Sequence, residues 1–152
     1  MEYRLLNASD ITANRTAMIG LMDMVLSDNI TQDYPADQAE RYVDKIPGYI
    51  EDGSAIVSGA FDDLLLVGFS WAYELNIFGE RRVHIDMVGV NPAYRKHGAA
   101  RKLVDLQIEE AKRRSIRIME AMTTKNNENS YTWFHSMGFY DERVKVRRDL
   151  EC

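Results

Sequence analysis

Cysteine is nearly absent from this chain of 152 residues, and its single cysteine, Cys152, is the last residue. An internal disulfide and a metal site built from several cysteines are therefore excluded, and we expect no metal centre. No apolar run approaches the roughly 18 residues that a membrane-spanning helix needs. The first four residues also lack the charged-then-apolar layout of a signal peptide. The sequence predicts a soluble, cytoplasmic protein without a membrane partner.

The chain also lacks a basic excess. Its net charge is −5, and no sustained run of lysine or arginine interrupts the acidic character, which argues against nucleic acid as the main partner. Residues 1–80 hold 14 acidic against 4 basic residues, whereas residues 81–152 hold 15 basic against 10 acidic ones. The second half could favour a polyanionic ligand and the first half a cation. Two solvated faces of opposite sign would explain the same asymmetry.

A length of 152 residues with 45% hydrophobic residues suits one domain with one core, which we place at residues 1–152. Apolar periodicity predicts helices at 11–26, 38–50, 98–114 and 127–137, and strands at 3–7, 55–61, 64–75, 82–90, 116–122 and 144–148. Hairpin strands run antiparallel while helical crossovers favour parallel neighbours. The order therefore predicts an α/β fold with a mixed central sheet flanked by about four helices.

The segment that organises the chain is a strand ending at Val90, a short loop from Arg95, and the helix that follows Gly98. The first N–H groups of a helix have no partner within it, and the helix dipole adds partial positive charge, so this junction suits an anion. Gly98 lets a phosphate approach the backbone closely. A P-loop is excluded because no Gly-Lys-Ser/Thr follows the glycine, and a dinucleotide fold is disfavoured because Gly-x-Gly-x-x-Gly is absent.

Two motifs carry a resemblance to a known family. Arg-x-x-Gly-x-Ala at 95–100, after a strand ending Val-x-Val-Asn-Pro at 88–92, resembles the acyl-CoA pyrophosphate loop of GNAT N-acetyltransferases. Downstream, Asn127-x-x-Ser130-x-x-x-Phe134 followed by Gly138-Phe139 resembles the second signature of that family. By itself the second motif could be an ordinary amphipathic helix with a glycine cap. The order of elements is also similar to the GNAT fold, so the resemblance covers essentially the whole chain.

The resemblance implies acetyl-CoA as a co-substrate and transfer of its acetyl group to an acceptor amine. It implies that the backbone at Val88, Gly89 and Val90 pairs with the pantetheine arm, which Asn127, Ser130 and Phe134 also contact. It further implies a set of residues around the pyrophosphate: Arg95, Lys96, His97, Gly98, Ala99, Ala100 and Arg101.

One position departs from the family pattern. Many relatives carry a tyrosine that acts as general acid where this chain has Phe134, and a phenyl ring cannot donate a proton. Tyr131 lies three residues earlier and is the better placed substitute, with Tyr140 as a second. Alternatively no strong acid is needed, since a thiol with a pKa near about 8.5 leaves passably well as thiolate.

A general base would help the reaction, because an alkylamine with a pKa of about 10.4 is mostly protonated at neutral pH. His84 and Asp86 lie two apart on a strand, which predicts that they point to the same face. Acidic residues near Asp86 commonly serve as the base in the family, and some relatives carry a glutamate at the position of His84. A polar residue on a buried strand can equally be a structural hydrogen-bonding group.

The acceptor is less defined. The region of the first two helices, which usually walls the acceptor site in this family, is rich in carboxylates and aromatic rings, and these suit a cationic amine. The residues are Asp28, Asp33, Tyr34 and Asp37, with Glu74 on the long strand. An acyl-CoA-binding module with little turnover, and an interaction domain that binds no CoA, are the alternatives. A homodimer joined through the C-terminal strand is a further expectation.

Overall fold

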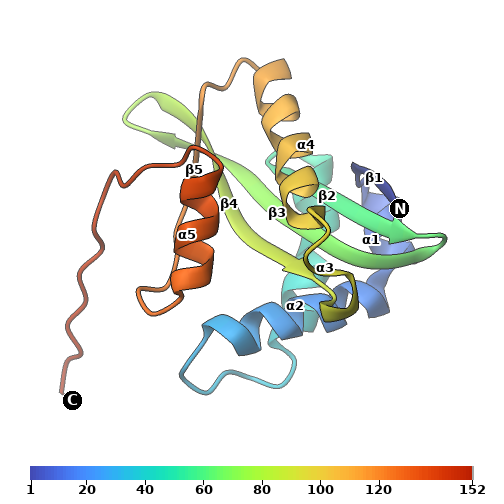
Figure 1. The fold of residues 1–152 in the computed structure, drawn as a ribbon, viewed down its shortest axis with the longest axis horizontal. Coiled ribbons are helices and arrows are strands. Elements are labelled where there is room, and N and C mark those ends of the chain that lie inside the picture. Colours follow the sequence, from blue (N-terminus) through green and yellow to red (C-terminus); the bar gives the residue numbers. More distant parts are fainter. Residues whose placement is uncertain (152) are drawn as a thin grey trace. The chain divides into compact units, whose positions relative to one another are not determined.

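The computed structural model describes residues 1–151, which divide into two compact units, residues 1–122 and the segment from residue 123 onward. The first unit contains a five-stranded sheet in the order β1-β2-β3-β4-β5 (Figure 1). Strands β1 to β4 are antiparallel neighbours, whereas β5 runs parallel to β4, which confirms the predicted mixed sheet. The strands are β1 (Glu2–Leu5), β2 (Ala55–Asp62), β3 (Leu65–Ile77), β4 (Glu80–Val90) and β5 (Ile118–Ala121).

The first unit also contains four α-helices and a short 3-10 helix. They are α1 (Ala8–Ala13), α2 (Arg15–Asn29), α3 (Gln38–Glu51), η1 (Pro92–Tyr94) and α4 (Ala99–Arg113). The single helix predicted at 11–26 is therefore two. Asn14 interrupts it with non-helical backbone angles (φ −112°, ψ 23°), and its side-chain amide donates to the Asp10 carbonyl at 2.9 Å. Asn7 and Asp10 form a capping box that starts α1 earlier than predicted.

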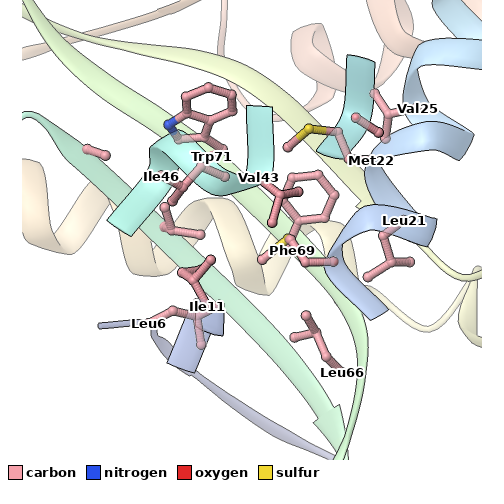
Figure 2. Packing of buried hydrophobic residues seen from close by; sticks show 14 of the residues in the cluster. Leu6, Ile11, Leu21, Met22, Val25, Val43, Ile46, Leu66, Phe69 and Trp71 are labelled. Carbon is pink, nitrogen blue, oxygen red and sulfur yellow. The ribbon is translucent and has the colours of Figure 1, made fainter. Parts of the chain in front are cut away.

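Helices cover both faces of the sheet. Alternate residues of β3 face opposite sides, so Phe69 and Trp71 point toward α2 and α3, whereas Ser70 points toward α4. Figure 2 shows Met22 from α2 and Ile46 from α3 beside these two aromatic rings. Phe69, Met22 and Ile46 are completely shielded from solvent. This core fixes α2 over β3 and β4, and α3 over β2.

A buried polar cluster fixes α4 to the other face. The Gln107 amide donates to the carbonyls of Ile56 (2.9 Å) and Ser70 (3.0 Å), and its oxygen accepts from the Ser70 hydroxyl at 2.7 Å. One turn earlier, the Ser58 hydroxyl donates to the Leu103 carbonyl at 2.8 Å. Gln107, Ser58 and Ser70 are all fully buried. A buried polar group without a partner would cost about 1–3 kcal/mol, so these bonds define one seat for α4 on the sheet.

The second unit contains α5 (Glu128–Ser136), which Asn127 caps by accepting from the Ser130 N–H at 3.1 Å. The strand predicted at 144–148 is wrong for the described residues, since this segment has no regular structure and Val144 and Val146 are exposed. A strand needs a neighbouring strand to pair its backbone, and the described part of the second unit has none.

The homodimer expected through that strand stays a prediction, as does the single domain. Within residues 1–151, no helix has the length and apolarity that crossing a bilayer requires.

Candidate functional site

The site begins where β4 and β5 part. Their parallel pairing runs from Arg82↔Ile118 to Ile85↔Ala121, after which β5 ends and β4 continues to Val90. Beyond Ile85, β3 is the sole strand among residues 1–151 that pairs with β4, so the other edge of β4 offers backbone N–H and C=O groups to a ligand. This edge includes Val88 and Gly89, where the sequence predicts contact with the pantetheine arm.

The N-terminus of α4 follows directly. Gly98 is the N-cap in the left-handed region (φ 76°), and no side chain of the described residues caps the helix. The first helical bond runs from the Lys102 N–H to the Gly98 carbonyl at 3.1 Å, so the N–H groups of Ala99, Ala100 and Arg101 have no acceptor inside the helix. A Cβ built on Gly98 would meet nothing within 4 Å. This open helix start fits a pyrophosphate.

The loop before α4 is basic and is attached to the end of β4. Arg95 donates from Nε to the Val90 carbonyl at 3.0 Å, and its Nη2 lies 3.9 Å from the Asp28 carboxylate of α2. Its guanidinium is therefore turned toward β4 and α2 in this structure. The side chains of Lys96, His97 and Arg101 are exposed.

Asp86 occupies a bulge on β4. Trp71 of β3 pairs with Met87 and the next residue, Ala72, pairs with Ile85, so Asp86 is the extra residue between them. Bulges re-aim a side chain and interrupt the two-residue alternation. The alternation argument that predicted a shared face for His84 and Asp86 is therefore invalid at this position, and strand spacing alone does not place the Asp86 side chain.

Electrostatic coupling nevertheless links the residues around the bulge. Burial raises the pKa of the Asp86 carboxyl above its usual range, and the nearby charge of His84 opposes that rise. Burial also raises the pKa of Tyr73, and the charges of Asp86 and Glu120 add to it. Asp86 is still accessible at the surface. An accessible carboxylate with a raised pKa is a better proton acceptor than an ordinary one.

His84 is buried, with 5% of its surface exposed, and its Nδ1 lies 2.6 Å from the Glu120 carboxylate of β5. The other Glu120 oxygen accepts from Arg82 at 3.2 Å. The Tyr73 ring packs on His84 with 5.2 Å between centroids. Sequence reasoning missed Glu120 and Arg82. A glutamate inside β5, whose other three residues are apolar, was the available signal.

An aromatic cluster lies on the same sheet face as His84. Trp71 stacks with Tyr49 (6.5 Å between centroids, 16° between planes) and meets Tyr42 edge-on at 6.3 Å. Its indole N–H is buried and, within residues 1–151, lacks a hydrogen-bond partner. Tyr42 and Tyr49 belong to α3, so this helix places aromatic rings beside β3 on the side of the sheet where the acceptor was expected.

The carboxylates expected around the acceptor are less free than their number suggests. Asp37, the N-cap residue of α3, accepts from Arg41 at 2.8 Å, and Asp28 lies near Arg95. Glu74 is elsewhere than predicted: Arg114, after the end of α4, donates to it at 2.9 Å, so it belongs to the α4 face of the sheet. The Tyr34 hydroxyl lies 3.0 Å from the hydroxyl of Ser27.

In the second unit, the Tyr131 hydroxyl donates to Asp141 at 2.7 Å, and this bond raises the pKa of Tyr131. A raised pKa makes the phenol a weaker acid, and its role in proton donation stays a prediction. Phe134 meets Phe139 edge-on at 5.1 Å between centroids, and Ser130 is half-buried. The contacts of Asn127, Ser130 and Phe134 with a pantetheine arm likewise stay predictions.

A family model described as "Acetyltransferase (GNAT) family" matches residues 22–139. The chain belongs to the GNAT family of acetyltransferases. This confirms the family, the enzyme class and acetyl-CoA as co-substrate, all of which the sequence predicted. No curated protein sequence matches the chain.

Solved structures of GNAT proteins share the fold. A ribosomal-protein-alanine N-acetyltransferase from Brucella melitensis biovar Abortus 2308 superposes with a TM-score of 0.72 at 22% identity, covering 98% of this chain and 100% of its own. An aminoglycoside N-acetyltransferase in complex with CoA gives 0.77 at 19% identity, with coverages of 97% and 93%. A predicted acetyltransferase from Clostridium acetobutylicum with acetyl-CoA gives 0.76 at 16% identity, with coverages of 97% and 95%.

Proposed function

We propose that this GNAT protein transfers the acetyl group of acetyl-CoA to a primary amine of a small molecule or peptide, by direct attack within a ternary complex. The observation that carries the proposal is the meeting of two open features at the end of β4. One is the β4 edge beyond Ile85, and the other is the uncapped N-terminus of α4 at Gly98. The first suits the amides of a pantetheine arm and the second suits its pyrophosphate.

Catalysis in this proposal begins with the amine nitrogen attacking the thioester carbonyl carbon. The C–S bond then breaks, CoA leaves as thiolate, and the amine loses one proton to a base. We propose His84 and Asp86 as the candidates for that base. The bulge at Asp86 and the contact between His84 and Glu120 support a specialised role for both residues. Tyr131 remains the candidate acid, with direct departure of the thiolate as the alternative.

A cationic amine is the proposed acceptor class. The aromatic rings of Trp71, Tyr49 and Tyr73 lie on the sheet face of His84, and aromatic faces attract cations. Among the structural neighbours, two acetylate acceptors of different kinds by their names, a ribosomal protein alanine and an aminoglycoside. A panel of polyamines, aminoglycosides and peptides, with neutral and anionic amines beside them, tests the class. Turnover confined to neutral or anionic acceptors would refute it.

Calorimetric titration with acetyl-CoA tests the binding site directly. Gly98→Glu places a carboxylate at the α4 N-terminus, where it repels phosphate and competes for the free N–H groups, so we expect at least tenfold weaker binding. Gly79→Glu is the matched control, because Gly79 also has a positive φ (86°) and open space around it but lies in the β3–β4 turn. Equal binding by the wild type and both variants would refute the proposed site.

A second candidate function is an acyl-CoA-binding module with little turnover. Phe134 favours it, because this side chain lacks the hydroxyl that serves as acid in many relatives. Release of free CoA thiol in the presence of the amine panel separates the two. Sustained release shows an enzyme, whereas tight acetyl-CoA binding without release shows a binding module.

A further inference from the structure

Glu120 is the residue of β5 that contacts His84, one of the two proposed bases. The parallel register sets Glu120 directly opposite His84, and the carboxylate Oε2 lies 2.6 Å from Nδ1 of the imidazole. Its second oxygen, Oε1, accepts from Arg82 at 3.2 Å. Arg82 is itself buried, at 6% exposure, and also donates to Glu80 at 2.8 and 2.6 Å. His84 is thus the buried end of a hydrogen-bonded chain that continues through Glu120 to Arg82.

We infer that Glu120, oriented by Arg82, is a positioning residue that holds His84 as the base of the acetyl transfer. It fixes the imidazole tautomer with hydrogen on Nδ1 and leaves the Nε2 lone pair to receive the proton of the acceptor amine. This inference rests on the proposed function, and it names a residue and a division of roles that the two signature motifs do not contain.

The tautomer follows from the partners. An ionised carboxylate can only accept hydrogen bonds, so the nitrogen 2.6 Å from Glu120 must be the one that carries hydrogen. In a neutral imidazole the other nitrogen is then an acceptor. Nε2 has no hydrogen-bond partner among the described residues, and it is not among their polar atoms sealed from solvent. It can therefore meet an incoming amine or a bridging water.

The surroundings of His84 separate its two sides. Glu120 and Arg82 face it from β5 and β4, Tyr73 packs on its ring from β3, and Asp86 lies in electrostatic reach on the β4 bulge. Through its pairing with Tyr73, His84 belongs to the sheet face that α2 and α3 cover, opposite α4. Nδ1 of His84 is already bonded to the Glu120 carboxylate, so proton exchange with a substrate is restricted to Nε2.

Arg82 has a role in this arrangement that an exposed arginine would not have. It donates to two carboxylates at once, so Glu120 is held in one orientation while its negative charge is balanced. The pairing of β4 with β5 sets the distance between the backbones of His84 and Glu120, so few side-chain rotamers are needed to bring imidazole and carboxylate together. Partners that orient a metal-binding imidazole matter by about 10–100-fold, and we expect an effect of similar size for an imidazole that acts as a base.

The proton balance of the step is simple. The amine nitrogen forms its bond to the carbonyl carbon and gives one proton to Nε2, so the imidazole becomes an imidazolium beside Glu120. The electrons of the breaking C–S bond leave with the thiolate. The imidazolium then returns its proton to the thiolate or to water, which restores the neutral ring with hydrogen on Nδ1. No oxidant or further reactant is needed.

The first test compares Glu120→Gln and Glu120→Asp with Glu109→Gln, an exposed glutamate of α4 as control. We expect Glu120→Gln to lower kcat by 10–100-fold while the KM for acetyl-CoA changes little, and Glu120→Asp to restore part of the rate. Loss of the negative charge also destabilises the imidazolium, so the acidic limb of the kcat/KM profile should move to lower pH. An unchanged kcat and pH profile in folded Glu120→Gln would overturn the inference.

A second test asks whether Glu120 acts through His84. In a His84→Gln background, Glu120→Gln should cost less than threefold, because a residue that acts through another loses its effect when that other is gone. The same fold-loss in both backgrounds would mean that Glu120 contributes only to folding or to another step.

A third measurement does not depend on turnover. Long-range ¹⁵N–¹H spectra of the His84 ring, recorded where its own titration shows the ring to be neutral, report which nitrogen carries hydrogen. We expect the Nδ1–H form in the wild type and a mixture in Glu120→Gln. A wild-type ring with hydrogen on Nε2 would overturn the inference. If no amine is acetylated but the Nδ1–H form is found, the proposed function fails and the positioning contact survives.

Discussion

Gly89 of β4 packs tightly against helix α2, and this contact yields a prediction with a definite size. A Cβ added to Gly89 would lie 2.6 Å from Cγ2 of Val25 and 3.1 Å from Cε1 of Phe69. Overpacking a core costs about 1–3 kcal/mol, and the shorter contact favours the upper half of that range. Alanine has fewer unfolded conformations than glycine, which offsets about 0.5 kcal/mol. We expect Gly89→Ala to lower the free energy of unfolding by about 2 kcal/mol.

Urea denaturation measures this cost, and a double-mutant cycle assigns it. Val25→Ala removes the nearer of the two atoms, so Gly89→Ala should cost at least about 1 kcal/mol less in that background. Gly20→Ala is the control on the same helix, because nothing lies within 4 Å of the added carbon, and helix propensity predicts a gain of about 0.5–1 kcal/mol. The same cost for Gly89→Ala in both backgrounds would refute the contact. Displacement of α2 should also weaken acetyl-CoA binding, since Arg95 contacts this helix.

Two further predictions concern titrating carboxylates. Burial raises the pKa of Asp86 above 3.8, so the folded protein loses stability as pH rises through the window between the unfolded and folded pKa values. Above that window, thermal melts should show Asp86→Asn to be more stable than the wild type, while its kcat is lower. A stability difference between the two proteins that does not change with pH would contradict this prediction. Hydrogen bonds from Arg113 and Arg114 lower the pKa of Glu110 from 4.5 to about 2, so its contribution is complete above 4.5 and is lost as pH falls toward 2. Because Arg113 is largely exposed, Glu110→Gln should cost only about 1 kcal/mol near neutral pH by urea denaturation, and an equal cost near pH 2 would contradict the assignment.

The sequence predicted the parts of the site that depend on local chemistry. Gly98 between a basic loop and an amphipathic helix is visible as a helix start without a side-chain cap, and the structure places it there with a positive φ. The position of β4 in the chain and the order of strands and helices around it followed from periodicity. These features need only a few neighbouring residues to be specified.

Features that depend on pairing between distant segments were not accessible. The bulge at Asp86 is defined by the register between β3 and β4, and the identity of residue 86 does not predict a bulge. The contact between His84 and Glu120 joins residues 36 apart through a parallel pair whose register the sequence does not show. The strand expected around Val144 failed for the related reason that alternation signals a possible strand without supplying its partner.

The buried bonds of Gln107 and Ser58 have a consequence for acetyl-CoA binding. Apolar contacts alone would let a helix slide or turn on a sheet at low cost, whereas hydrogen bonds are directional and cannot be kept after a shift. A slip of one residue along α4 would move its N-terminus by about 1.5 Å and rotate it by about 100°. The bonds at Leu103 and Gln107 forbid that slip. The N–H groups at the start of α4, where we propose that the pyrophosphate binds, are thus oriented by bonds in the middle of the helix.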